Sequence, residues 1–160
     1  MGARAEALAD RIVLGARNLS VFAGGMSDAE WRRAVLPDGR TAGVIVHHVA
    51  SMYPVEVDLA RTLAAGQPIT GLTWGHVAEI NAKHAREHAG TTVHEAIDLL
   101  GRNAKAAADA IHAFTDKELD TAAPCSLYGD APVTAQFFVE DHAMRHSWHH
   151  LAKIRTALQR

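Results

Sequence analysis

Long stretches of apolar residues at helical spacing constrain the fold of this chain most. Between residues 3 and 21, Leu8, Ile12 and Leu19 recur at intervals of four and seven residues, the spacing of one face of an α-helix. The alternation of apolar and polar residues that is typical of strands is almost absent, and good helix formers such as Ala, Leu and Glu are abundant. The sequence therefore predicts an all-α chain.

Capping residues and helix breakers divide this pattern into separate helices. Ser27 and Thr92 are each followed three residues later by glutamate, the pattern of a capping box, and Thr41 is a good N-cap. Pro54 removes a backbone donor and predicts a kink near residues 50–53. The helices that we expect lie over about 3–21, 27–31, 41–65, 73–88 and 92–114, with one further turn at 115–119. The segments 73–88 and 92–114 are either two helices or one bent element.

The segment between residues 120 and 131 shows no periodicity and contains Pro124 and Gly129, so it is predicted to be a loop. Pro132 then lies in the first turn of a last helix that reaches about Leu158. Long helices with short connections predict an antiparallel four-helix bundle. A length of 160 residues suits a single domain, residues 1–160.

Composition excludes several classes of protein. Sixteen basic and 18 acidic residues leave a formal charge of −2, so no nucleic-acid-binding face is indicated. The single cysteine, Cys125, rules out an internal disulfide and a cysteine zinc site. No apolar run approaches the roughly 18 residues of a membrane span, and the first ten residues do not resemble a signal peptide. We expect a cytoplasmic protein.

Eleven histidines are the unusual feature of the composition. With about 100° of rotation per residue, His48 falls at the centre of an apolar stripe with Met52, Val55 and Leu59. His47 falls on the polar side of the same helix, beside Asp58 and Arg61. His48 taken alone is more often a core histidine than a ligand.

The last helix carries His142, His146 and His150 at intervals of four residues, a spacing that stacks side chains on one face. His146 and His150 flank the apolar side and form the preferred inward pair, and the alternative pair of His142 and His146 stays open. His142 and His149 fall with charged residues on the solvent side, yet both are possible fourth ligands.

Three mutually close, buried imidazoles are hard to satisfy without an ion. His48, His146 and His150 therefore predict a metal site rather than unrelated core histidines, and three protein ligands leave a position open for water or substrate. Glu56 lies about 80° from His48 and is a candidate catalytic residue, either as a partner of a ligand or as a proton shuttle. An ordinary paired carboxylate is an equally good interpretation of Glu56.

Other features carry less weight. His84 and His88 are also four residues apart, but the charged residues around them favour a solvated helix face. No zincin, nucleophile-elbow, P-loop or dinucleotide-binding motif is present. Tyr53 and Trp148 are expected to pack rather than to line a site, and Arg145 is expected in solvent.

Short motifs give the chain a resemblance to the DinB/YfiT-like family of metal-binding four-helix bundles. They are Val46-His47-His48-Val49, the final His146-x-x-x-His150-Leu151-Ala152-Lys153-Ile154, Trp31, Asp38-Gly39-Arg40-Thr41 and Asn81-Ala82. By this resemblance the metal triad is His48, His146 and His150, the ion is commonly zinc or nickel, and a homodimer is expected. Several members use low-molecular-weight thiols as isomerases or S-transferases, and the larger mycothiol-dependent ones carry a C-terminal domain that this sequence does not show.

Three hypotheses about function follow from the predicted metal triad and from the family resemblance. The leading hypothesis is metal-assisted activation of a low-molecular-weight thiol for attack on a small electrophile, by S-transfer or isomerisation. The second is hydrolysis by metal-activated water, which needs a carboxylate base such as Glu56. The third is a non-catalytic bundle whose ion serves stability.

Overall fold

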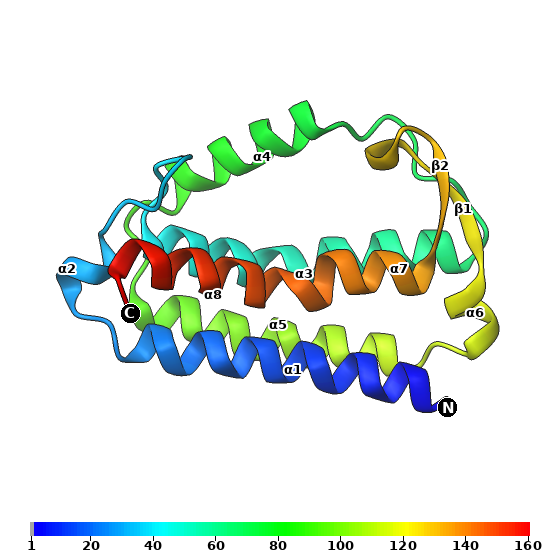
Figure 1. Cartoon of the computed structure of the whole chain (residues 1–160), viewed down its shortest axis with the longest axis horizontal. Coiled ribbons are helices and arrows are strands. Elements are labelled where there is room, and N and C mark those ends of the chain that lie inside the picture. Colours follow the sequence, from blue (N-terminus) through cyan, green and yellow to red (C-terminus); the bar gives the residue numbers. More distant parts are fainter. Residues whose placement is uncertain (1) are drawn as a thin grey trace.

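The computed structural model describes residues 2–160 and is a bundle of long helices with one helix and one hairpin outside it (Figure 1). The long rods are α1 (Ala3–Gly24), α3 (Ala42–Ala64), α5 (Val93–His112) and a composite last helix. That last helix is built from α7 (Ala135–Val139), a π-helical segment (Glu140–Met144) and α8 (Arg145–Leu158). The smaller elements are α2 (Asp28–Trp31), α4 (Trp74–Glu87), α6 (Asp116–Asp120), β1 (Ala122–Cys125), a 3₁₀ turn (Ser126–Tyr128) and β2 (Ala131–Thr134). The predicted all-α four-helix bundle is confirmed.

Chain direction in the bundle follows from the position of α4. In Figure 1, α3 and α5 both run from the end where α2 lies towards the end where α6 lies, because α4 returns the chain outside the bundle between them. α1 packs against α5 and α8, and α3 packs against α5 and the last helix. Successive long rods therefore do not simply alternate in direction.

The helix starts are fixed by the capping residues found in the sequence. Ser27 and Thr92 form complete capping boxes, and the Thr41 hydroxyl accepts a hydrogen bond from the backbone of α3. Thr115 forms a third capping box at the start of α6. The core between the rods is aliphatic, as the periodicity predicted; its fully buried residues include Leu8, Ile12, Leu19, Ile45, Val49, Leu100, Ile111 and Ile154.

Pro54 lies inside α3, yet the helix is continuous on both sides of it. Proline has no N–H, so the carbonyl of Ala50, four residues earlier, loses its helical partner. The side-chain amide of Asn103 on α5 donates to this carbonyl at 2.8 Å. The backbone group that Pro54 leaves unpaired is thus satisfied by a neighbouring helix.

The predicted loop at residues 120–131 is wrong in part, because this region forms a hairpin. β1 and β2 pair antiparallel from Ala122–Thr134 to Cys125–Ala131, and Pro132 lies in β2 rather than in the last helix. Pro124 pairs with Pro132 in the register of this hairpin. Because proline is rare within strands, the composition of these two segments does not predict strands. Thr134 caps α7, and the last helix therefore begins at Ala135.

A π-helical segment interrupts the last helix at residues 140–144. Such a segment inserts an extra residue per turn and changes which residues share a face on either side of it. None of the helices described in residues 2–160 combines the length and the apolar character required to cross a membrane.

Candidate metal centre

Three imidazoles from α3 and the last helix converge on one point. Nε2 of His48 lies 3.1 Å from Nε2 of His146. The ring centroid of His150 lies 5.5 Å from that of His48 and 4.9 Å from that of His146. One ring nitrogen of each residue lies within 4.8 Å of the other two. The structure thus brings together the three histidines selected from the sequence.

The donor set of this triad fits a divalent ion. His48 and His150 are buried, and the Nδ1 atom of each has no hydrogen-bond partner in the described part of the chain. Burial lowers the pKa of His48 to about 2, with the imidazole of His146 acting in the same direction. The pKa of His150 is lowered by the same causes. Both rings are therefore neutral at physiological pH, the form of imidazole that binds metal.

Tetrahedral coordination at about 2.0–2.1 Å places ligand nitrogens about 3.4 Å apart. The 3.1 Å separation between His48 and His146 lies close to this value.

Glu56 is the carboxylate nearest to the triad. It is 5% exposed, and its Oε1 atom lies 2.8 Å from Nδ1 of His146, although the contact is not aligned as a hydrogen bond. A carboxylate behind a histidine fixes the orientation of the ring and raises its basicity as a ligand. The second oxygen, Oε2, is buried and has no hydrogen-bond partner within residues 2–160.

The triad opens into a cavity of about 330 Å³ between α3, α4 and the last helix. The helical stripe of His48, Met52, Val55 and Leu59 lines this cavity, whereas Val49 and Tyr53 point into the bundle core. The expectation that the stripe packs into the bundle is therefore corrected. α3 has two apolar faces, and the second faces α4 across the cavity.

His142 and His149, which we expected on the solvent side of the last helix, are partly buried instead. His142 stacks on Phe138 with ring centroids 4.2 Å apart, and its Nε2 lies 2.8 Å from the hydroxyl of Tyr128. Both His142 and His149 are half-buried and line the cavity. The π-helical segment explains the difference for His142, because an ideal helical wheel does not hold across it.

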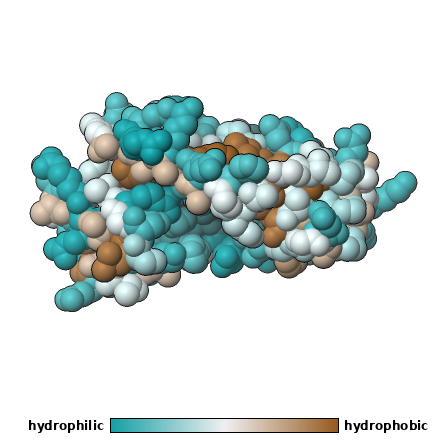
Figure 2. All heavy atoms as spheres, turned by 90° about the horizontal axis from the view of Figure 1, so that it is seen from above, coloured by the Kyte–Doolittle hydropathy of each residue, from teal (hydrophilic) through white to brown (hydrophobic). Residues whose placement is uncertain are grey.

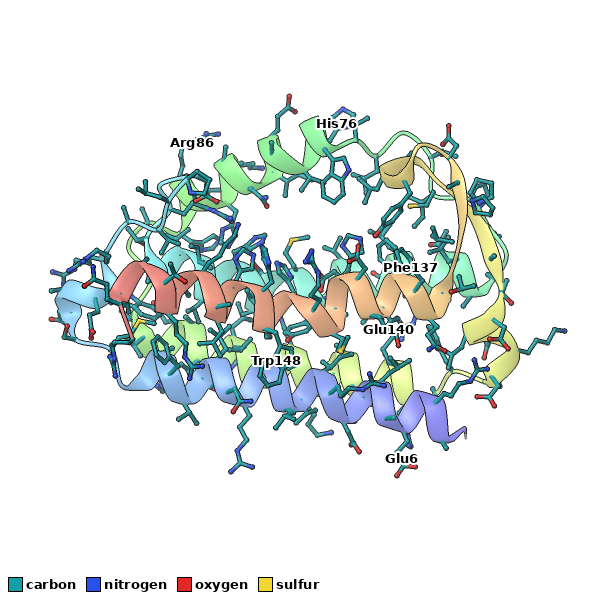
Figure 3. All side chains as sticks on the ribbon, in the orientation of Figure 1. Glu6, His76, Arg86, Phe137, Glu140 and Trp148 are labelled. Atoms are coloured by element: carbon teal, nitrogen blue, oxygen red, sulfur yellow. The ribbon has the colours of Figure 1, made fainter. Side chains whose placement is uncertain are left out.

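Tyr53 and Trp148 have packing roles, as expected. The hydroxyl of Tyr53 is 2.6 Å from that of Ser147 in the core, and the indole of Trp148 lies against Gly15 of α1. Figure 3 shows Trp148 between the last helix and α1, away from the α4 side. Arg145 is paired with Asp141 at 3.4 Å at the edge of the cavity.

Arg40 was not assigned a role from the sequence, yet its side chain lines the cavity and is 12% exposed. Asp38 accepts hydrogen bonds from Nε and Nη2 of this guanidinium at 3.0 and 2.7 Å. Nη1 is buried and has no partner in the described chain, and the same holds for Oδ1 of Asn81 on α4. Both residues belong to the short motifs noted above, but only the fold shows that they line the same cavity as the triad.

The expectation for a second group of histidines is also corrected. His84 and His88 are not on a solvated face; both are half-buried and contact His47 of α3. His47 is half-buried as well, so it does not lie with Asp58 and Arg61 in solvent. The reason is that α4 lies along this side of α3 and covers it.

Comparison with known proteins agrees with this architecture. Residues 11–154 match the model of the DinB superfamily, and the chain belongs to that superfamily. No curated protein sequence matches the chain.

Two solved structures share the fold. YfiT from Bacillus subtilis, a probable metal-dependent hydrolase with an unusual four-helix bundle topology, is similar with a TM-score of 0.76 and 14% identity, over 99% of this chain and 89% of that one. The mycothiol-dependent maleylpyruvate isomerase is similar with a TM-score of 0.70 and 14% identity. That match covers 96% of this chain but 63% of the isomerase chain.

Proposed function

We propose that the protein is a divalent-metal-dependent enzyme that acts on a small molecule in the cavity beneath α4. His48, His146 and His150 would hold the ion, with zinc or nickel as the expected metal. The observation that carries the proposal is the convergence of three imidazoles, two of them buried with unpartnered nitrogens, at the wall of a 330 Å³ cavity. An ion held by these residues would lower the pKa of a bound thiol or water and so would supply a nucleophile at neutral pH.

The cavity favours a small thiol that carries polar groups of its own. Its wall is mostly apolar, and the apolar side chains are Met52, Val55, Leu59, Leu72, Trp74, Val77, Ile80, Leu127 and Phe138. Arg40 and Asn81 also line the cavity, and each has a buried polar atom without a partner in the described chain, Nη1 of Arg40 and Oδ1 of Asn81. A low-molecular-weight thiol with carboxylate and amide groups satisfies both of these atoms, whereas an apolar ligand would leave them unpaired.

In this proposal Glu56 does two things. Its Oε1 atom would orient the ring of His146, and its carboxylate, which lines the cavity, would accept the proton that the nucleophile gives up. The thiolate would then attack an electrophilic carbon held against the apolar wall; a C–S bond forms and the leaving group departs with the electron pair of its broken bond, as chloride does from 1-chloro-2,4-dinitrobenzene. The resemblance to thiol-dependent isomerases and transferases supports this reaction class.

The test is binding and turnover with defined probes. Zinc-loaded wild-type protein should bind glutathione or cysteine, and should accelerate their conjugation to 1-chloro-2,4-dinitrobenzene. His150→Ala should lose both properties, while His76→Ala, on the outer side of α4 (Figure 3), should keep them. Equal thiol binding by wild type and His150→Ala would contradict the proposal.

A second candidate is hydrolysis, which the free oxygen of Glu56 favours because it can deprotonate a water as well as a thiol. This reading predicts metal-dependent turnover of p-nitrophenyl esters in the absence of thiol. A non-catalytic bundle predicts neither activity, and a lower melting temperature once the metal is removed. The expected homodimer stays a prediction that light scattering on the purified protein tests.

A further inference from the structure

A second group of three histidines lies where the end of α4 meets α3. Nδ1 of His47 lies 2.9 Å from Nε2 of His84. The ring of His88 stacks on that of His47 at 4.0 Å and lies 4.6 Å from that of His84. One ring nitrogen of each residue lies within 4.8 Å of the others. Ligand nitrogens around a tetrahedral zinc ion lie about 3.4 Å apart, which is within the 4.8 Å limit that these three nitrogens share.

This group is distinct from the triad that faces the cavity. His47 and His48 are adjacent on α3, so their side chains leave the helix about 100° apart. The rings of His48 and His84 are edge to face with centroids 5.6 Å apart. The two clusters therefore adjoin, but they share no residue.

The hydrogen bonds within the second group leave one buried ring nitrogen unsatisfied. Nδ1 of His47 and Nε2 of His84 can share one proton, and the hydroxyl of Ser51 lies 3.2 Å from the same Nε2 atom. Nδ1 of His84 is buried and has no hydrogen-bond partner among residues 2–160.

Acidic side chains complete the surroundings. A surface groove of about 520 Å³ begins at His47 and His88 and is lined by Glu87, Glu95 and Asp98. Glu87 and Glu95 place negative charge along the groove and would offset part of the charge of a cation, whereas Asp98 is already paired with Arg102, which also lines the groove. The groove also leaves the site open to solvent, so an ion can enter from outside.

A metal site at this position would hold α4 against α3, because α4 is otherwise only weakly packed. Within Trp74–Glu87 no residue is buried, so burial of apolar surface contributes little to holding this helix. Figure 1 shows α4 standing apart from the other long helices, and Figure 2, which looks down on this side, shows apolar patches among hydrophilic side chains. Yet Trp74, Val77, Ile80 and Asn81 of α4 form one wall of the cavity.

We propose that His47, His84 and His88 form a second divalent-metal site that fixes the end of α4 to α3. The ion takes nitrogen ligands from both helices, and it closes one wall of the cavity without taking part in the chemistry there. Zinc suits the site because it accepts three imidazoles and a water without a strict geometric demand. This inference does not depend on the function proposed for the cavity.

Zinc stoichiometry tests the site directly. After dialysis against zinc and gel filtration, elemental analysis should find two ions per wild-type chain. His84→Ala/His88→Ala should keep one, His146→Ala/His150→Ala should keep one, and the combination of all four substitutions should keep none. His76→Ala, on the same helix but facing outward, should keep two. Loss of no zinc in His84→Ala/His88→Ala would overturn the proposal, even if the triad binds its own ion.

Hydrogen exchange tests the consequence for α4. In His146→Ala/His150→Ala, whose cavity triad is disabled, zinc should slow exchange of the amides of residues 78–88 at least tenfold. The further substitutions His84→Ala and His88→Ala should abolish this protection. Unchanged exchange on adding zinc would overturn the assignment of the site as a link between the helices.

Discussion

Oε1 of Glu56 lies 2.8 Å from Nδ1 of His146, on the side of the ring opposite the nitrogen that faces His48. This contact between a buried carboxylate and a half-buried imidazole predicts that the charge of Glu56 strengthens zinc binding at the triad. Glu56→Gln keeps the size of the side chain but removes its charge. We expect about 10- to 100-fold weaker zinc binding at the triad.

The measurement is a zinc titration against a competing chelator in the His84→Ala/His88→Ala background, so that one site is observed. Glu79→Gln, on the exposed face of α4, is the matched control and should bind zinc as before. An unchanged affinity in Glu56→Gln would mean that this carboxylate does not support the ligand.

Asn103 and Pro54 are coupled through one carbonyl group. Asn103→Ala removes the donor to Ala50, leaves that carbonyl unpaired and should lower the free energy of unfolding by about 1–3 kcal/mol. Pro54→Ala restores a backbone N–H to the same carbonyl. Denaturant unfolding of both single variants and the double variant should therefore show that Asn103→Ala costs less when position 54 is alanine. Additive effects would contradict the coupling.

The stability of the metal-free protein should fall on acidification below pH 6.5. In the unfolded chain His48 takes up a proton near its ordinary pKa of 6.5, whereas in the folded protein its pKa is lowered to about 2. The unfolded state therefore binds more protons in this interval, and stability decreases as the pH falls. The contribution of His48 between pH 6.5 and about pH 5 amounts to about 2 kcal/mol.

Unfolding in the presence of a chelator at several pH values measures how steeply the free energy of unfolding changes with pH. His48→Gln should make this dependence weaker. A slope that is identical in wild type and His48→Gln would show that His48 takes up its proton equally in the folded and unfolded states.

Gly43 is required by the close approach of α3 to Trp31. A Cβ atom at position 43 would clash with Cε2 of the indole, whose Nε1 donates to the carbonyl of Thr91 at 2.9 Å. Gly43→Ala should destabilise the protein by about 1–3 kcal/mol. Gly101→Ala on α5, where no described atom lies within 4 Å of the added carbon, should instead be neutral or stabilising. Thermal unfolding of both variants tests the contrast.

The helices could be predicted from the sequence because their signals are local. Ser27, Thr41 and Thr92 cap their helices through contacts within three residues, and all three are found where the pattern placed them. The hairpin could not be predicted in the same way. Its register pairs Pro124 with Pro132, and no local preference of these residues reveals that the two segments lie side by side.

The candidate site was predictable only in part for a related reason. His48, His146 and His150 stand out because two of them share a helix face and the third lies in an apolar stripe. The environments of His47, His84 and His142 depend on long-range features that no periodicity carries. These are the placement of α4 over α3 and the π-helical segment in the last helix.

The central claim is that His48, His146 and His150 bind a divalent ion, and the most direct test is the metal content of untagged protein purified without chelator. Elemental analysis of wild type, His48→Ala and His76→Ala after equilibration with zinc should show one ion fewer per chain in His48→Ala than in the other two. Equal metal content in wild type and His48→Ala would contradict the account, because the three histidines would then pack together without coordinating an ion.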